Sequence, residues 1–138
     1  MKILLTGGAG YIGSHTSLAL LDSGHEVTII DDLSTGNENL IPAKANFIKC
    51  NINDIEKIDN LLKKETFDIL MHFAGYIQVE ESIHKPEKYY NNNTENSKIL
   101  IDTCVKNNLT NIVFSSTAAA YGNPKKNKNV HEDEKLKP

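Results

Sequence analysis

The fold is decided by one stretch near the start of the chain, Gly7-Gly8-Ala9-Gly10-Tyr11-Ile12-Gly13-Ser14. The apolar run Ile3–Thr6 precedes it and predicts a strand, and apolar residues at helical spacing follow it. A strand, a glycine turn and a helix in that order direct backbone N–H groups and the positive end of a helix at an anion. The motif glycines permit a tight turn, close approach of a diphosphate and close packing of helix on strand. The stretch therefore predicts a dinucleotide site at this turn.

Two acidic residues indicate which dinucleotide binds. Asp31 and Asp32 end the next apolar run, roughly 20 residues after the glycines, where a carboxylate accepts hydrogen bonds from the adenosine ribose. A 2′-phosphate would face these carboxylates and would favour an arginine nearby, but all 15 basic residues are lysine. The sequence therefore predicts NAD rather than NADP.

Length and composition limit the other possibilities. A chain of 138 residues fits one domain, and its 39% hydrophobic and 24% charged content is ordinary for a globular protein. The net charge of −3 offers no basic field for nucleic acid, and no apolar run approaches the length of a membrane span. With no signal peptide at the start, and with Cys50 and Cys104 far apart, we expect a cytoplasmic protein with reduced thiols and no metal site.

Strand-like and helix-like segments alternate along the chain. We predict strands at Lys2–Thr6, Glu26–Asp31, Asn46–Cys50, Asp68–Phe73 and Asn111–Ser115, and helices at Tyr11–Ser23, at Asp54–Lys64 and from Pro86 onward. Apolar strands separated by helices imply an α/β fold with a doubly wound parallel sheet of the Rossmann type. In this fold, ligands bind at the carboxyl ends of the strands, where the candidate polar residues of this chain fall.

Taken together, these residues resemble the extended short-chain dehydrogenase/reductase superfamily and, within it, the UDP-glucose 4-epimerase family. The resemblance covers the whole chain. It is carried by Thr6–His15, Asp31-Asp32-Leu33 with Gly36-Asn37, His72-Phe73-Ala74-Gly75, Tyr89-Tyr90-Asn91-Asn92-Asn93, and Phe114–Gly122.

The resemblance implies a reaction and a set of site residues. NAD takes a hydride from C4 of a UDP-hexose while a tyrosine removes the 4-hydroxyl proton, and the hydride returns to the opposite face of the 4-keto sugar. Thr117 is then the catalytic residue that hydrogen-bonds the reacting 4-oxygen. The cofactor-binding residues implied are Gly7, Gly10, Tyr11, Ile12, Gly13, Asp31, Asp32, Asn37, Asn51, Ile52, Phe73, Ala74, Gly75, Asn92 and Ser115.

The catalytic tyrosine and lysine of the family are expected beyond Pro138. We therefore expect residues 1–138 to form the NAD-binding domain of a longer enzyme, without its C-terminal substrate domain and inactive alone. One Tyr-x-x-x-Lys spacing does occur, from Tyr121 to Lys125. We interpret it as a decoy, because Gly122 and Pro124 both oppose a helix there.

Smaller departures from the family concern the cofactor site and the partners. Ile77 stands where many such epimerases have a cofactor-contacting lysine, Asn51 replaces the usual aspartate near adenine, and Glu80 replaces a glycine. The resemblance also implies a homodimer through the helix after Pro86, whose expected apolar stripe includes Tyr90, Ile101 and Val105.

Two other functions stay open from sequence. One is a different NAD-dependent nucleotide-sugar enzyme, such as a dehydratase or decarboxylase. The other is a non-catalytic dinucleotide-binding module. His72, on the predicted fourth strand, is expected to be a hydrogen-bonded core residue rather than a catalytic one.

Overall fold

The computed structural model describes residues 1–123 and 129–137. Five strands form one sheet in the order β3-β2-β1-β4-β5, and every neighbouring pair is parallel. This confirms the prediction of a doubly wound parallel sheet of the Rossmann type. The strands are β1 (Lys2–Thr6), β2 (Glu26–Asp31), β3 (Asn46–Lys49), β4 (Ile69–His72) and β5 (Ile112–Phe114).

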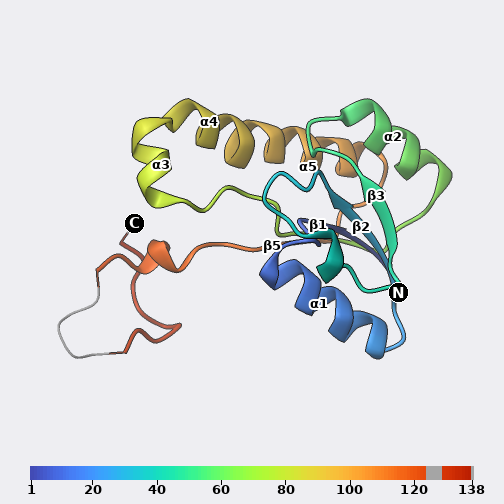
Figure 1. The fold of residues 1–138 in the computed structure, drawn as a ribbon, viewed down its shortest axis with the longest axis horizontal. Helices are drawn as coiled ribbons and strands as arrows, with labels where there is room; N and C mark the ends of the chain where they lie inside the picture. The colour runs from blue at the N-terminus through green and yellow to red at the C-terminus, as the bar shows by residue number, and fades with distance from the viewer. Residues whose placement is uncertain (124–128, 138) are drawn as a thin grey trace.

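Helices cover both faces of this sheet (Figure 1). One face carries α1 with the short η1 beside it, and the other carries α2 and the long helix that contains α5. The helical elements are α1 (Tyr11–Asp22), η1 (Glu38–Leu40), α2 (Ile55–Lys64), α3 (Val79–His84), α4 (Pro86–Tyr90), η2 (Asn91–Asn96), α5 (Ser97–Lys106) and η3 (Ala118–Tyr121). No helix among the described residues is both long and apolar enough to cross a membrane.

The alternation of side chains along β1 builds two separate cores. Leu4 packs with Leu62 of α2 and Leu100 of α5, whereas Leu5 packs with Ile29 and the partly buried Leu20 of α1. Successive residues of a strand point to opposite faces, so one short apolar run supplies both layers.

Local signals set most of the element ends. The Asp54 side chain accepts a hydrogen bond from Lys57 N–H at 3.3 Å and caps α2, as its position predicts. Pro86 starts α4 at a position where its missing N–H costs nothing. The helix from Pro86 is continuous to Lys106, but its middle segment, η2, is π-helical, and α3 before it was not predicted.

His72 is a core residue, as predicted. It is 1% exposed, and its ring nitrogens lie 2.5 Å from Thr6 Oγ1 and 2.8 Å from Ser97 Oγ. Burial lowers the pKa of His72 from its ordinary value of 6.5 to about 4, so the ring is neutral at physiological pH. The cysteines Cys50 and Cys104 are both buried and free.

Candidate functional site

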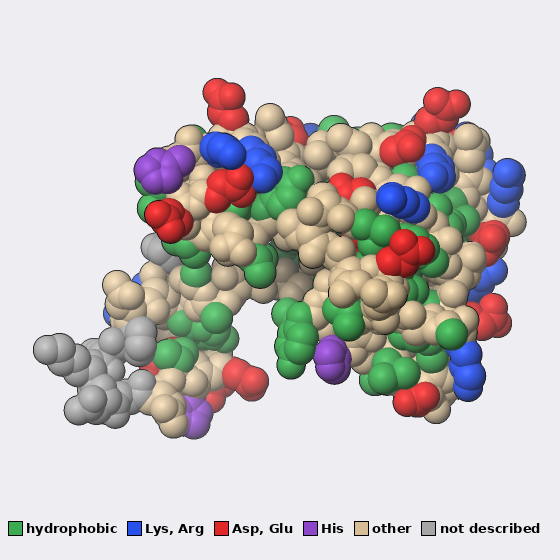
Figure 2. All heavy atoms as spheres, in the orientation of Figure 1, with side chains coloured by type: hydrophobic (Ala, Val, Ile, Leu, Met, Phe, Trp, Pro, Cys, Tyr) green, Lys and Arg blue, Asp and Glu red, His purple; other side chains and the backbone are tan. Residues whose placement is uncertain are grey.

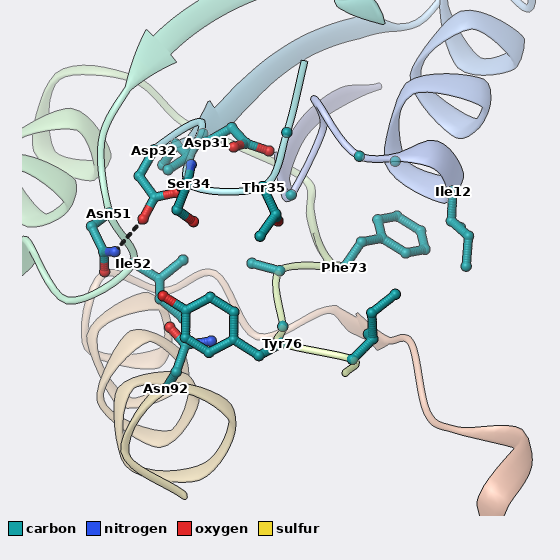
Figure 3. Close-up of a pocket in the computed structure, with 18 of the residues that line it drawn as sticks. Ile12, Asp31, Asp32, Ser34, Thr35, Asn51, Ile52, Phe73, Tyr76 and Asn92 are labelled. Carbon is teal, nitrogen blue, oxygen red and sulfur yellow. Dashed lines mark hydrogen bonds between the residues drawn. The ribbon is translucent and has the colours of Figure 1, made fainter. Parts of the chain in front are cut away.

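A cavity of about 460 Å³ lies at the carboxyl ends of the strands. Its volume falls within the range of small-molecule and cofactor sites. It hollows the surface between the α3–α4 region and the start of α1 (Figure 2), and Figure 3 shows its walls. Residues from the exits of β1, β2, β3 and β4 and from the long helix line it.

The glycine turn has little space for side chains at two of its glycines. Gly7 has φ +74°, and a Cβ there would lie 2.6 Å from Ala74 N at the exit of β4. A Cβ on Gly13 would lie 2.2 Å from Gly7 O, so only glycine lets α1 approach the turn this closely. On Gly10 the nearest contact would be 3.3 Å. These three positions fit the tight turn, close packing and open approach that the motif predicts.

The start of α1 supplies donors beside this turn. Tyr11, Ile12 and Gly13 all line the cavity, and they occupy the first turn of the helix, where N–H groups have no intrahelical acceptor. The first-turn side chains include no acid. The helix N-terminus is therefore suited to an anion such as a diphosphate.

Asp31 ties the end of β2 to the glycine turn. One carboxylate oxygen accepts Ala9 N–H at 2.9 Å, and the other accepts Leu33 N–H at 2.8 Å. Each oxygen keeps a second lone pair, so Asp31 can hold the turn and still accept a ribose hydroxyl.

Asp32 is fixed by its neighbours in a similar way. Its carboxylate accepts Ser34 N–H at 2.8 Å and Asn51 Nδ2–H at 2.5 Å (Figure 3). Partial burial alone would raise the pKa of Asp32, but these hydrogen bonds outweigh it and hold the pKa below the ordinary value. Asp32 therefore stays charged, and this negative charge opposes a 2′-phosphate.

The exits of β3 and β4 complete the walls. The Asn51 amide oxygen accepts Asn53 N–H at 3.0 Å, so both ends of that side chain are held. Ile52 beside it also lines the cavity. Across from them are Phe73, Ala74 and Gly75, which follow β4, and Asn92, which reaches the cavity from η2.

Three predicted site residues lie outside this cavity. The Asn37 N–H donates to Ala9 O at 2.9 Å and its side chain caps η1, so it braces the loop behind the turn. Ser115 N–H continues the sheet by donating to His72 O. The exposed Thr117 accepts Ala119 N–H at 3.2 Å and caps η3, because the chain after β5 runs away from the sheet (Figure 1). The roles expected for these three residues therefore stay predictions, and none of the three lines the cavity.

Tyr121 is also remote from the cavity. It ends η3, its hydroxyl lies 3.5 Å from Glu132 O, and Gly122 follows with φ +69°. Lys125 lies outside the described residues, so the interpretation of Tyr121 and Lys125 as a decoy stays a prediction.

Sequence reasoning missed a group of cavity residues, most of which lie around α3 and α4. Ser34 and Thr35 lie between the two parts of a quoted motif, Leu33 and Gly36, so that motif could have indicated them. The others come from the loop after β4 and from two short helices, where no periodic pattern marks them. The missed residues are Ser34, Thr35, Tyr76, Gln78, Glu81, Lys88 and Tyr89.

The parallel sheet, the glycine turn at the start of α1 and the paired acids after β2 define a dinucleotide-binding Rossmann protein. Residues 3–138 match the model of the NAD dependent epimerase/dehydratase family, and the chain belongs to that family. Its members use NAD as cofactor, and the cavity described above fits that group.

Similar proteins are UDP-glucose 4-epimerases. The chain is 47% identical over 123 residues to the UDP-glucose 4-epimerase of Azospirillum brasilense, covering 89% of this chain and 35% of that protein. It is 43% identical over its whole length to that of Lactobacillus helveticus, of which it covers 42%. The solved structure of the Brucella ovis UDP-glucose 4-epimerase in complex with NAD matches 99% of this chain and 42% of its own, with a TM-score of 0.89 at 34% identity. The chain thus spans well under half the length of these relatives.

Proposed function

We propose that this chain forms the NAD-binding part of an enzyme that interconverts UDP-hexoses at C4. The observation that carries the proposal is the cavity at the ends of β1, β2 and β3, which unites the glycine turn with Asp31, Asp32 and Asn51. Bound NAD supplies the hydride acceptor and donor for a reversible oxidation of the sugar. The choice of UDP-hexoses as the substrate class rests on the relatives, which are named UDP-glucose 4-epimerases.

The roles of this chain's residues follow from their positions. The amides of the α1 start hold the diphosphate, and Asp31 accepts hydrogen bonds from the adenosine ribose. Asn51, Ile52 and Asn92 contact the cofactor from the other walls. Thr117 hydrogen-bonds the reacting oxygen only if the segment after β5 moves or is held differently in the whole enzyme.

A chimera tests the reaction itself. The homologous segment of the Azospirillum brasilense enzyme is replaced by this chain, and the purified chimera is given UDP-galactose. The expected product is UDP-glucose, and Thr117→Val is expected to lower kcat by about 10- to 100-fold, at or below the lower end of general acid–base contributions. Thr110→Val, on the loop before β5, is the matched control.

Other outcomes would favour the alternatives. A deoxy-keto or decarboxylated sugar product would indicate a dehydratase or decarboxylase. NAD binding with no sugar chemistry in a folded chimera would favour a binding module.

Cofactor choice is tested on the 138-residue chain by calorimetry. We expect NAD to bind at least about tenfold more tightly than NADP, since an added phosphate would meet the Asp32 charge without an arginine to neutralise it. Asp32→Asn should narrow that difference, while Asp22→Asn, on the last turn of α1, should not. Equal affinities in the unaltered chain would contradict the proposed role of the acids.

We also propose that copies of the chain associate through the face of the long helix. Along this helix, Tyr90, Ile99 and Val105 are 61%, 42% and 48% exposed. The expectation for Ile101 was wrong in one respect, because Ile101 is partly buried against the core of its own chain. The other apolar residues of this face are available for a partner copy.

A further inference from the structure

Tyr76 lines the cavity, although none of the sequence motifs includes it. We propose that its ring is the face on which the adenine base of NAD stacks, and that Tyr76 thereby positions the adenosine half of the cofactor. The inference rests on the proposed function, because it requires NAD to occupy this cavity.

The main chain of Tyr76 is clamped on both sides by one side chain. Asn93 Oδ1 accepts Tyr76 N–H at 2.9 Å, and Asn93 Nδ2 donates to Tyr76 O at 2.9 Å. The same Asn93 oxygen accepts a hydrogen bond from Asn92 at 2.9 Å. Asn93 belongs to the π-helical segment η2, and such wide turns occur often at functional sites. One side chain of the long helix therefore binds both main-chain polar groups of Tyr76, which lies in a loop.

The ring of Tyr76 is braced as well. Lys88 Nζ lies 4.4 Å from the ring centroid, and the Tyr89 ring lies 5.6 Å away at an angle of 57°. Glu81 contacts both of these side chains. It forms an ion pair with Lys88 at 3.0 Å and accepts a hydrogen bond from the Tyr89 hydroxyl at 2.9 Å. Lys88 lies over one face of the ring, and the proposal assigns the opposite face to the planar base.

The direction of the Tyr76 ring indicates which part of the cavity it contacts. In Figure 3, Tyr76 extends toward the wall formed by Asn51 and Ile52, away from Ile12 at the glycine turn. Asp31 and Asp32, the residues suited to the adenosine ribose, lie on that same side. A fixed aromatic ring and an aliphatic side chain on the cavity walls form a slot for a flat base, and Asn51 and Asn92 lie beside it.

The test compares NAD with ADP, which keeps the adenine but lacks the nicotinamide. Tyr76→Leu keeps an apolar side chain and removes the ring, and it should weaken NAD and ADP by the same factor, roughly tenfold. Tyr76→Phe should bind both like the unaltered chain. The control is Tyr90→Leu, the same exchange at a residue that is 61% exposed and does not line the cavity.

A spectroscopic readout separates stacking from a purely structural role. The fluorescent etheno analogue of ADP is quenched when its base stacks on an aromatic ring. Quenching by the unaltered chain and by Tyr76→Phe, but not by Tyr76→Leu under saturating conditions, is the expected result.

The possible failures are distinguishable. If the unaltered chain binds neither NAD nor ADP, the proposed function is wrong and this inference with it. If both bind and Tyr76→Leu binds them equally well, only the stacking role is overturned. A loss for NAD without a loss for ADP would place the ring against the nicotinamide and would also overturn it.

Discussion

The two halves of the strand-end edge are built differently. At the exits of β1, β2 and β3, Asp31 and Asp32 are each bound to backbone N–H groups, and Asn51 links the second of them to the next strand. At the exit of β5, Val113 and Phe114 are 41% and 54% exposed, and the hydrogen bonds of Thr117 to other described residues stay within its own turn. The difference indicates that hydrogen bonds fix the geometry of the first half, which we propose for the cofactor, whereas the β5 half, which we propose for the sugar, is exposed.

The largest expected effect tests the β5 half. The 138-residue chain should convert UDP-galactose at least about 10²-fold more slowly than the chimera, the scale of a lost general base. On the cavity wall, burial and the hydrogen bond to Glu81 raise the pKa of the Tyr89 hydroxyl, which disfavours its deprotonation. A coupled assay for UDP-glucose measures the rate. If the 138-residue chain turned over UDP-galactose as fast as the chimera, the difference drawn between the two halves would be wrong. Loss of that turnover in Tyr121→Phe would then assign the chemistry to η3.

A second prediction concerns the strand that joins the two halves. His72 has a pKa of about 4 when folded and an ordinary value near 6.5 when unfolded. Well above pH 6.5 the His72 ring is neutral in both the folded and the unfolded chain, so it does not lower the free energy of unfolding. As the pH falls toward 4, only the unfolded chain takes up the proton, so the free energy of unfolding falls by on the order of 3 kcal/mol.

Urea unfolding at pH 7 and pH 4.5 measures this loss. The variant His72→Gln should show a smaller fall between the two pH values, while His84→Gln, at an exposed histidine, should behave like the unaltered chain. Equal falls in all three proteins would show that other groups govern the acid sensitivity of the fold.

A third prediction separates folding from binding within the cofactor half. Gly13→Ala places a Cβ 2.2 Å from Gly7 O and should destabilise the chain by about 1–3 kcal/mol. Gly10→Ala meets only a 3.3 Å contact, so it should leave the thermal midpoint nearly unchanged and weaken NAD binding instead. Thermal unfolding and calorimetry on both variants decide. A Gly10→Ala variant with full NAD affinity would mean that the diphosphate does not approach that atom.

The smallest expected effect concerns the outer face of the long helix. Val105→Glu should weaken self-association several-fold in sedimentation experiments, because it places a charge on an apolar contact face. Val130→Glu is matched in exposure, at 44% against 48%, and lies elsewhere. A monomer at every concentration tested, or an equal effect of both substitutions, would contradict an interface at α5.

How far the sequence predicts each half depends on the range of the interactions. The glycine turn, the β2 acids and the Asp54 cap follow from short-range spacing, and the strands of the sheet were predicted to within about a residue at each end. Ile101 was misplaced because helical periodicity does not show which apolar residues of a two-sided helix meet the core.

Tyr76 was missed for a different reason. Its role depends on Asn93, Lys88 and Glu81, which approach it from three separate helical segments. Thr117 matched its motif, but the segment after β5 is hydrogen-bonded to the C-terminal segment, from Lys137 N–H to Ala120 O, and no local pattern predicts that contact.

The sheet order also affects how the chain folds during its synthesis on the ribosome. β1 is the central strand, yet its β4 partner follows about 66 residues later, as the Thr6–His72 contact illustrates. At ordinary translation rates the central strand therefore remains for several seconds with one edge unpaired after β2 has paired with the other. We expect nascent chains that end before β4 to be chaperone clients, and those that include β4 to be released from that dependence.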